Sequence, residues 1–205
     1  MWSRLALALA VCAGLSACGA TSVYAPDEAV RAATFVSDEP PSITLYTVIS
    51  NRSNAGAHTG LLINGSQRVM FDPAGSWTHP RVPERNDVFF GVTDRMVNYY
   101  IDYHARETFR VVEQKVFVSP EVAQLVMTRA LNYGAVPQAQ CSRSTSTILS
   151  GVPGFEAVGT TWYPLKLSEA FAQTPGVQTR TITDEDADDN HGVLLTQATT
   201  AVQPD

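Results

Sequence analysis

The stretch His58-Thr-Gly-Leu-Leu-Ile-Asn-Gly-Ser-Gln-Arg-Val-Met-Phe-Asp72 contains two apolar segments separated by Asn64-Gly65. Asn-Gly between two apolar runs is the strongest short-range signal for a β-hairpin. The pattern therefore predicts one strand that begins at His58 and a partner strand that closes at Asp72. Pro73 follows at once, and the hairpin ends there because proline cannot donate a hydrogen bond to a sheet.

The length of the hairpin loop decides which residue faces His58. If Asn64-Gly65 is a strict two-residue turn, His58 lies opposite Phe71, whose ring cannot accept a proton from an imidazole. One extra loop residue, or a bulge, puts Asp72 opposite His58 instead. A slip of one residue moves every side chain to the other face, so only one register can hold. Asp72 also has a purely structural explanation, as the first residue of an Asp-Pro turn.

Periodicity and helix-start signals predict the other elements. Residues 43–49 alternate apolar and polar side chains as a strand does. Thr93 can cap a helix, and Ser119-Pro120-Glu121 combines a cap residue with a first-turn proline and acid. The further predicted elements are a short helix over 27–35, a surface loop over 76–92, a strand within 107–118, a helix from Cys141, a short helix over 164–171 and an edge strand over 177–182. Strands followed by helices and a late strand predict an α+β fold, with a small antiparallel sheet packed against helices.

The two ends of the chain differ from the middle. Arg4, the apolar residues 5–15 and the small residues before Cys18 match a lipoprotein signal peptide over 1–17, with ordinary secretory cleavage as the alternative. Cys18 would then carry the lipid and residues 18–42 would form a lipidated tether. Residues 43–183 are predicted as one globular domain. Residues 184–205 begin with an acidic run and are predicted as a disordered, solvated tail.

These features predict a location in the bacterial cell envelope. Gly19 stands where an inner-membrane retention signal usually has Asp, which favours a lipid anchor in the outer membrane that faces the periplasm. Loss of Arg4 leaves 13 of the 14 basic residues against 20 acidic ones, a formal charge of −7. That balance excludes a basic patch for nucleic acid. The predicted membrane contact is the lipid alone, since no second apolar run is long enough to span a bilayer.

Cys141 is the one cysteine outside the first eighteen residues, and it lies in Ala139-Gln-Cys-Ser-Arg-Ser-Thr-Ser-Thr-Ile-Leu149. Small polar residues followed by apolar ones predict that Cys141 lies in the first turn of a helix. Unpaired amides and the helix dipole stabilise a thiolate at that place. An unpaired thiol in an oxidising compartment favours a functional role, and a buried inert cysteine is the alternative.

The other histidines have ordinary structural explanations. His79 lies in a predicted loop, His104 on the apolar face of a predicted helix and His191 in the predicted tail. No pair has a spacing such as His-Glu-x-x-His, so neither a metal nor a cofactor is predicted. Three loop aromatics are candidates for lining an acyl or sugar groove, or for packing as lids: Trp77, Trp162 and Tyr163.

A histidine that opens a hairpin, an Asp-Pro-Ala-Gly end to that hairpin and a later Gln140-Cys141-Ser142 helix start resemble the circularly permuted papain-like cysteine hydrolases. This is the lecithin retinol acyltransferase-like branch of the cell-wall endopeptidase superfamily, and the resemblance covers residues 43–175. It implies a permuted papain-like fold with Cys141 as nucleophile, His58 as base and the Cys141 amide as an oxyanion donor. Its third, orienting residue would be Asp72, where this chain departs from a clear match.

The resemblance implies a thiol hydrolase or acyltransferase that acts on an amide or ester bond through a Cys141 thioester. A cell-wall peptide or an acyl lipid would be the accessible substrate in the envelope. The alternative is a non-catalytic lipoprotein that uses the same fold as a binding or scaffold domain. A phenylalanine opposite His58 would favour this alternative, because the imidazole would then have no orienting partner.

Overall fold

The computed structural model describes residues 19–200, which contain six helices and seven strands. In chain order these are α2 (Asp27–Ala32), β1 (Ser42–Ser50), β2 (Gly56–Asn64), β3 (Arg68–Phe71), β4 (Glu84–Arg85), β5 (Val88–Phe90), α3 (Asp94–His104), β6 (Phe109–Phe117), α4 (Pro120–Leu131), α5 (Cys141–Leu149), α6 (Pro164–Phe171), β7 (Gln178–Ile182) and α7 (Asn190–Thr200). The predicted α+β class is confirmed.

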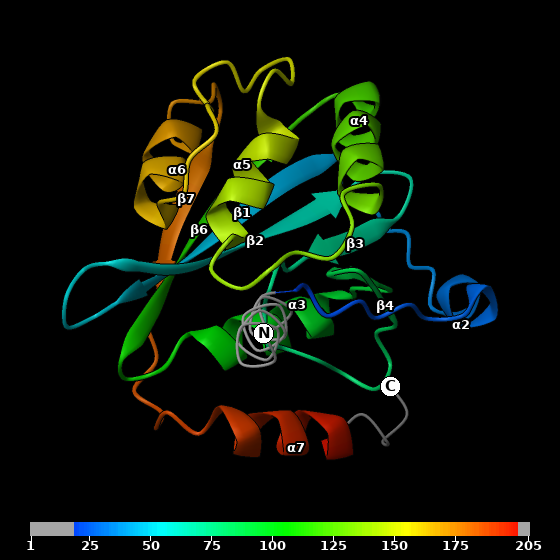
Figure 1. The fold of residues 1–205 in the computed structure, drawn as a ribbon, viewed down its shortest axis with the longest axis vertical. Coiled ribbons are helices and arrows are strands. Elements are labelled where there is room, and N and C mark those ends of the chain that lie inside the picture. Colours follow the sequence, from blue (N-terminus) through cyan, green and yellow to red (C-terminus); the bar gives the residue numbers. More distant parts are fainter. Residues whose placement is uncertain (1–18, 201–205) are drawn as a thin grey trace, which may run out of the picture.

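The seven strands form one open sheet in the order β4-β5-β3-β2-β1-β6-β7, and every neighbouring pair is antiparallel. Figure 1 shows helices on both faces of this sheet: α4, α5 and α6 lie on one face, α3 lies on the other, and α7 packs beneath α3. The central strand β1 is buried from Ser42 to Ile49. Ile43 and Leu45 belong to the apolar cluster under α4, α5 and α6, whereas Tyr46 and Val48 belong to the cluster on the α3 side.

The β2–β3 hairpin has neither of the two predicted registers. Asn64 pairs with Arg68 and Leu61 pairs with Phe71, so residues 65–67 form the loop. Phe71 is therefore opposite Leu61 and not His58, and Asp72 is not directly opposite His58 either. The amide of Gly65 donates to the carbonyl oxygen of Gln67 (3.0 Å), which closes the loop locally. Both predicted registers were wrong because the Asn-Gly signal locates a turn without fixing the length of its loop or the residue at which the loop begins.

The helix starts follow the sequence signals. Thr93 Oγ1 accepts from the amide of Met96 (3.4 Å) at the start of α3, and Ser119 Oγ accepts from the amide of Val122 (3.3 Å) at the start of α4. These bonds satisfy amides that a helix N-terminus leaves without intrahelical partners. The helix α5 begins at Cys141, as predicted.

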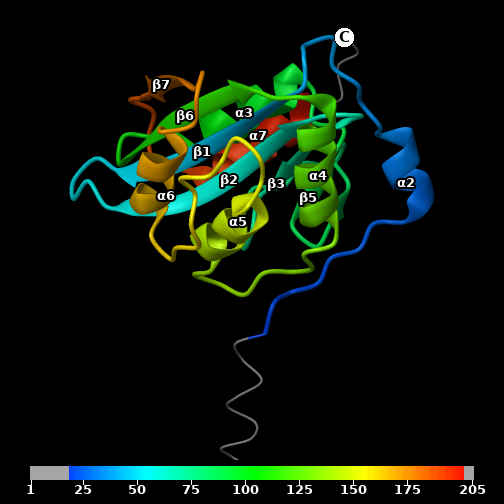
Figure 2. The same cartoon turned by 90° about the horizontal axis from the view of Figure 1, so that it is seen from above.

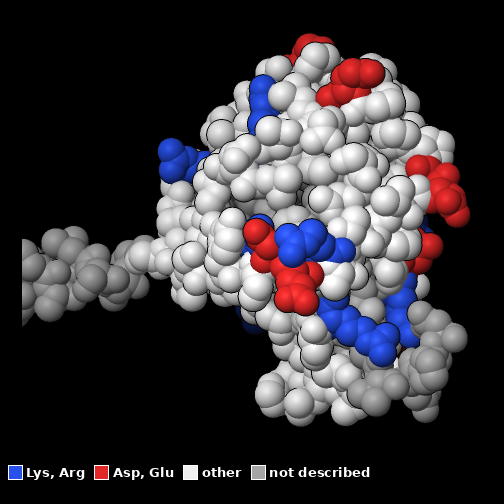
Figure 3. All heavy atoms as spheres, turned by 90° about the vertical axis from the view of Figure 1, so that its right-hand side faces the viewer, with Lys and Arg blue, Asp and Glu red and all other residues white. Residues whose placement is uncertain are grey.

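The segment 19–41 differs from the free tether that the sequence predicts. Tyr24 forms an isolated antiparallel bridge with Arg85 of β4, and the Arg85 guanidinium lies over the Tyr24 ring, 4.5 Å from its centroid. Arg85 also pairs with Asp27 (2.5 Å) at the start of α2. The segment is therefore attached to one edge of the sheet. On the face seen in Figure 3, acidic and basic side chains lie next to one another in small groups.

Two other regions also differ from their predictions. The region 76–92 contains β4 and β5, and Trp77 within it is buried in the α3-side core. The predicted solvated tail instead contains α7, whose buried Gln197 donates through Nε2 to the Tyr99 carbonyl (3.0 Å) and to Asp102 (2.9 Å). The predicted signal peptide, Cys18 and residues 201–205 lie outside the described residues. Among the described residues, no helix has the length and apolar character needed to cross a membrane.

Candidate active site

The candidate site lies where β2 continues beyond the end of its partner β3. The last β3 pair is Leu61 with Phe71, whereas β2 extends back to Gly56. Continuing this register by one residue places Asp72 opposite Gly60, two residues from His58 and therefore on the same face of β2. Asp72 thus reaches His58 diagonally across the strand end, which is a distance that long side chains can bridge.

The His58 ring is held by a buried carboxylate. His58 Nε2 and Asp72 Oδ1 are 2.6 Å apart, and Asp72 is 1% exposed. The Tyr100 hydroxyl, from α3, donates to the same Asp72 oxygen (2.8 Å). The structure therefore brings together His58 and Asp72, the predicted base and third residue, and adds Tyr100.

Two glycines leave room for this carboxylate. A Cβ on Gly60 would collide with the Tyr100 hydroxyl, and a Cβ on Gly75 would collide with the Asp72 carboxylate. Gly60 is also buried within β2. Both are positions where the absence of a side chain permits the close approach of other groups. Gly60 lies inside the hairpin motif, but the sequence alone does not show that Tyr100 would occupy the space above it.

Cys141 is the first residue of α5 and is 8% exposed. Burial raises the pKa of the thiol, but hydrogen bonding and charge interaction with His58 outweigh that effect. The backbone amides of Thr59 and Ser142 act in the same direction, and the net pKa of Cys141 is lowered. Thr59 also approaches α5 through its hydroxyl, 3.5 Å from that of Thr145. The thiol therefore lies against the β2 edge, next to the His58 ring.

The same contacts act on the imidazole. Burial lowers the pKa of His58, but the charge and hydrogen bond of Asp72, together with the Cys141 thiol, raise it to about 10. Burial raises the pKa of Asp72, but the interactions with His58 and the Tyr100 hydroxyl lower it overall. Since Nε2 of His58 is committed to Asp72, Nδ1 is the nitrogen left for the thiol. These directions favour a thiolate–imidazolium pair with an ionised Asp72 behind it.

The ring of His104 stacks against the ring of His58. The two rings are nearly parallel, with an interplanar angle of 7° and centroids 5.5 Å apart. His104 Nδ1 bonds to the Tyr100 carbonyl oxygen (2.8 Å). Burial is the largest effect on its pKa, which is lowered to about 4. His104 is therefore a neutral packing partner of His58 at neutral pH, and Nδ1 carries its proton because a carbonyl oxygen only accepts.

Asp87 fixes the two loops that carry the site and was missed by the sequence analysis. Its Oδ1 accepts from the Ala74 amide (3.2 Å), in the turn after Asp72, and its Oδ2 accepts from the Val136 amide (2.7 Å), in the loop before α5. Burial raises the pKa of this carboxyl. Asp87 has a positive φ of 65°, which aspartate tolerates better than most residues. The carboxylate therefore ties the Asp72 side of the site to the Cys141 side.

Three possible metal-ligand atoms also meet here. One atom each of His58, Asp72 and His104 lies within 4.8 Å of the other two, a cluster that spacing along the sequence could not reveal. A metal ion on all three would have to replace the 2.6 Å hydrogen bond between His58 and Asp72. A second group, Asp102, Asp184 and Asp186, already has Arg106 paired with two of its members.

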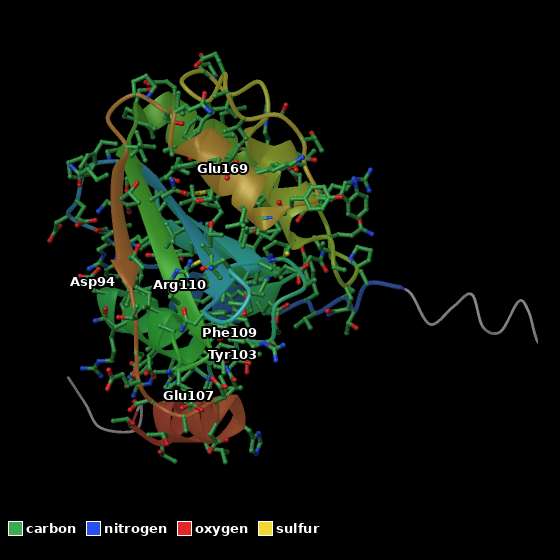
Figure 4. The ribbon with its side chains drawn as sticks, turned by 90° about the vertical axis from the view of Figure 1, so that its left-hand side faces the viewer. Asp94, Tyr103, Glu107, Phe109, Arg110 and Glu169 are labelled. Carbon is green, nitrogen blue, oxygen red and sulfur yellow. The ribbon has the colours of Figure 1, made fainter. Side chains whose placement is uncertain are left out.

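A cavity of about 360 Å³ borders His58 on the α3 side of the sheet. Its other walls come from five separate parts of the chain: Val48, Ala57, the turn Ala74–Ser76, four residues between the end of α3 and the start of β6 (Tyr103, His104, Arg106 and Phe109), and Asn190. Figure 4 shows Tyr103 and Phe109 close to one another at the end of the sheet that faces α7. This volume is at the small end of the range for ligand pockets in proteins. Asn190 belongs to α7, so the region predicted as a tail contributes to the cavity beside His58.

The remaining candidates have mixed outcomes. Trp77 and His79 are buried on the α3 side of the sheet, where their rings stack on one another. Trp162 and Tyr163 are exposed, and the Arg143 guanidinium lies 4.8 Å from the centroid of the Trp162 ring. Gln140 precedes α5 but makes no capping hydrogen bond with its side chain.

Comparisons of the chain with protein-family models, with curated proteins and with solved structures found no match.

Proposed function

We propose that this protein is an envelope-anchored cysteine hydrolase or acyltransferase of the permuted papain-like type. The observation that carries the proposal is the position of the His58 ring, which lies between the Cys141 thiol and the buried Asp72 carboxylate. A nucleophile, a base and a group that orients the base are the parts that thiol-based acyl transfer needs. The fold is compatible with the family, since an antiparallel sheet packs against the helix that begins with Cys141.

The chemistry follows from the protonation states. The Cys141 thiolate attacks the carbonyl carbon of an amide or ester, and the developing oxyanion accepts a hydrogen bond from the Cys141 amide at the helix start. His58 protonates the leaving amine or alcohol, which produces a thioester on Cys141. Water, an alcohol or an amine, activated by the now neutral His58, then attacks the thioester and frees the thiol. Asp72 keeps the ring oriented and stabilises its positive charge.

The non-catalytic alternative loses the observation that motivated it. A scaffold role was favoured if Phe71 lay opposite His58 and left the ring without an acceptor. Phe71 pairs with Leu61, and Asp72 accepts from His58 instead. Burying a carboxylate beside a histidine and a thiol costs free energy, and a scaffold role gives no reason for that cost.

The location in the envelope is part of the proposal and comes from the sequence alone. We infer cleavage before Cys18, acylation of Cys18 and an outer-membrane anchor that faces the periplasm. Cell-wall peptides and acyl lipids are the two substrate classes within reach of such an anchor.

Labelling with a thiol-reactive probe tests the proposed chemistry. The measured quantity is the initial labelling rate of Cys141 at pH 7, read by peptide mass spectrometry. His58→Ala and Asp72→Asn are expected to lower the rate by at least about tenfold, which corresponds to one pKa unit. His191→Ala is the matched control, because His191 is exposed on α7 and should not affect the rate. Equal rates in wild type and His58→Ala would mean that His58 does not activate the thiol.

A further inference from the structure

Two polar atoms at the candidate site take no part in the proposed reaction. Asp72 Oδ2 is buried and has no hydrogen-bond partner among the described residues. His104 donates from Nδ1 to the Tyr100 carbonyl oxygen (2.8 Å), so Nε2 of its neutral ring keeps a lone pair. That nitrogen makes no hydrogen bond to any of residues 19–200. A buried carboxylate oxygen and an imidazole nitrogen are therefore both free to bind a cation.

Both groups lie close to the ring of His58. One atom each of His58, Asp72 and His104 lies within 4.8 Å of the other two. Zinc holds its ligand atoms at about 2.0–2.2 Å in a tetrahedron, which places them roughly 3.3 Å apart. Small rotations of the side chains toward the ion close this difference. Two imidazoles and one carboxylate are also a ligand set that zinc uses in centres where its fourth ligand is water.

The surroundings of the three side chains fit a metal centre. The Tyr100 carbonyl fixes the tautomer of His104, and the Tyr100 hydroxyl donates to Asp72 Oδ1 (2.8 Å). Partners of this kind orient histidine and carboxylate ligands in metalloproteins. His58 and His104 both line the cavity of about 360 Å³. The cavity therefore gives an ion a path to the ligands and leaves room for a water molecule on it.

The charges around this cavity are compatible with a bound cation. Arg106 lines the cavity, but its guanidinium is paired with Asp102 (2.8 Å) and Asp186 (3.4 Å). The carboxylate of Asp87 lies close enough to Asp72 for their charges to interact. The positive charge of Arg106 is therefore compensated, and a further negative charge lies near the carboxylate that would bind the ion.

We propose that His58, Asp72 and His104 bind one zinc ion, and that this ion inhibits the thiol chemistry of Cys141. The metal site is independent of the proposed function, whereas the inhibition rests on that function. The ion replaces the Nε2 proton of His58, which passes to solvent, and it breaks the hydrogen bond between His58 and Asp72 (2.6 Å). A neutral ring with zinc on Nε2 carries its proton on Nδ1, so it cannot accept a proton there. The base of the reaction is thereby lost.

The two uses of His58 lie toward opposite faces of the sheet. In Figure 2, as in Figure 1, strands β1 and β2 lie between α5, which begins at Cys141, and α3, which ends at His104. A zinc ion held with His104 acts on the base from the side away from the thiol. The site therefore differs from ordinary binding of zinc by a cysteine thiolate, because Cys141 is not one of its ligands.

Isothermal titration calorimetry with zinc chloride tests the metal site in the Cys141→Ser protein, which lacks the nucleophilic thiol. We expect one zinc ion per chain. His104→Phe in the same background keeps a ring against His58 but removes one ligand, so it should weaken binding by at least about tenfold. His191→Phe, at an exposed position of α7, is the matched control. Absence of binding, or equal affinity in the two histidine variants, overturns the metal site.

X-ray absorption at the zinc edge identifies the ligands without any change to His104, and therefore decides the question even if His104→Phe does not fold. The zinc complex of the Cys141→Ser protein should show two imidazole ligands, with oxygen atoms in the remaining positions. A spectrum without imidazole ligands overturns the metal site.

Hydrolysis of p-nitrophenyl acetate tests the inhibition, because its leaving group needs no proton. The initial burst of p-nitrophenol reports acylation of Cys141, and the steady rate reports attack of water on the thioester, which needs the base. Cys141→Ser measures the hydrolysis by zinc alone, which is subtracted. Saturating zinc is expected to lower the steady rate of wild type at least about tenfold while the burst keeps its amplitude. His104→Phe should need at least about tenfold more zinc for the same effect.

The outcomes separate the two proposals. Loss of the burst in zinc, or equal sensitivity to zinc in wild type and His104→Phe, overturns the inhibition, because the ion would then act at the thiol or elsewhere. Wild type that hydrolyses nothing without zinc contradicts the proposed function. The binding measurements on Cys141→Ser do not depend on that result, so they report on the metal site alone.

Discussion

The Asp72 carboxylate receives two hydrogen bonds on one oxygen, from the ring of His58 and from the hydroxyl of Tyr100. Its other oxygen, Oδ2, is buried and has no hydrogen-bond partner. A buried carboxylate is costly unless nearby groups compensate its charge, and here the compensation is the positive charge of His58. At the scale of single residues, the candidate site therefore depends on close packing around Asp72 as much as on the side chains of Cys141, His58 and Asp72 themselves.

Gly60→Ala tests this packing directly. The new Cβ would overlap the Tyr100 hydroxyl in a fully buried place, so we expect the free energy of unfolding to fall by about 1–3 kcal/mol. Urea denaturation followed by circular dichroism measures the change. Gly159→Ala is the matched control, since no heavy atom lies within 4 Å of its added Cβ, and its effect should stay within about 0.5 kcal/mol. Equal stability of the two variants would show that Gly60 is not needed for the approach of Tyr100.

At the scale of elements, local signals in the sequence located most of the site. The helix starts at Thr93, Ser119 and Cys141 were predicted because a cap or first-turn pattern is written within a few residues. The hairpin was also predicted, but its register was not. The Asn-Gly signal fixes neither the length of the loop nor the residue at which the loop begins, and the loop is residues 65–67.

The missed parts of the site are long-range in character. Tyr100 reaches Asp72 from a helix 28 positions later, and Asp87 reaches Val136 across 49 positions. No local pattern marks such partners. The helix α7 was missed because an acidic run precedes it and its apolar residues have weak periodicity, so its place depends on Gln197 bonding to α3.

Asp87→Asn tests whether one side chain joins the two loops. Asparagine keeps the positive φ but offers one carbonyl oxygen in place of two carboxylate oxygens, so either Ala74 or Val136 loses its acceptor. We expect a loss of about 1–3 kcal/mol in unfolding free energy, the cost of a buried unsatisfied amide. Faster hydrogen exchange at those two amides and slower labelling of Cys141 should accompany it. The control is Asp188→Asn on the exposed surface. Unchanged exchange at both amides would show that Asp87 does not join the loops.

At the scale of the whole molecule, the candidate site is built from both sides of the sheet. Cys141 comes from the helix layer of α4, α5 and α6, whereas Tyr100 and His104 come from α3 on the opposite face (Figure 1). They meet because β3 is short and leaves the β2 edge open beside His58. Because β3 ends early, His58 and Cys141 come into contact although they are far apart in the sequence.

The pH dependence of Cys141 labelling tests the central claim most directly, because it reports the pKa of the thiol. The thiolate reacts, so the labelling rate rises as pH increases through the pKa of Cys141. His58 lowers that pKa, and the imidazolium persists up to a pKa of about 10. We therefore expect the midpoint in wild type to lie below the ordinary cysteine value of about 8.5, and the midpoint in His58→Ala to rise to that value or above it, since burial is the largest effect on this pKa and the variant removes the strongest effects that oppose it. The same midpoint in both proteins would contradict the account.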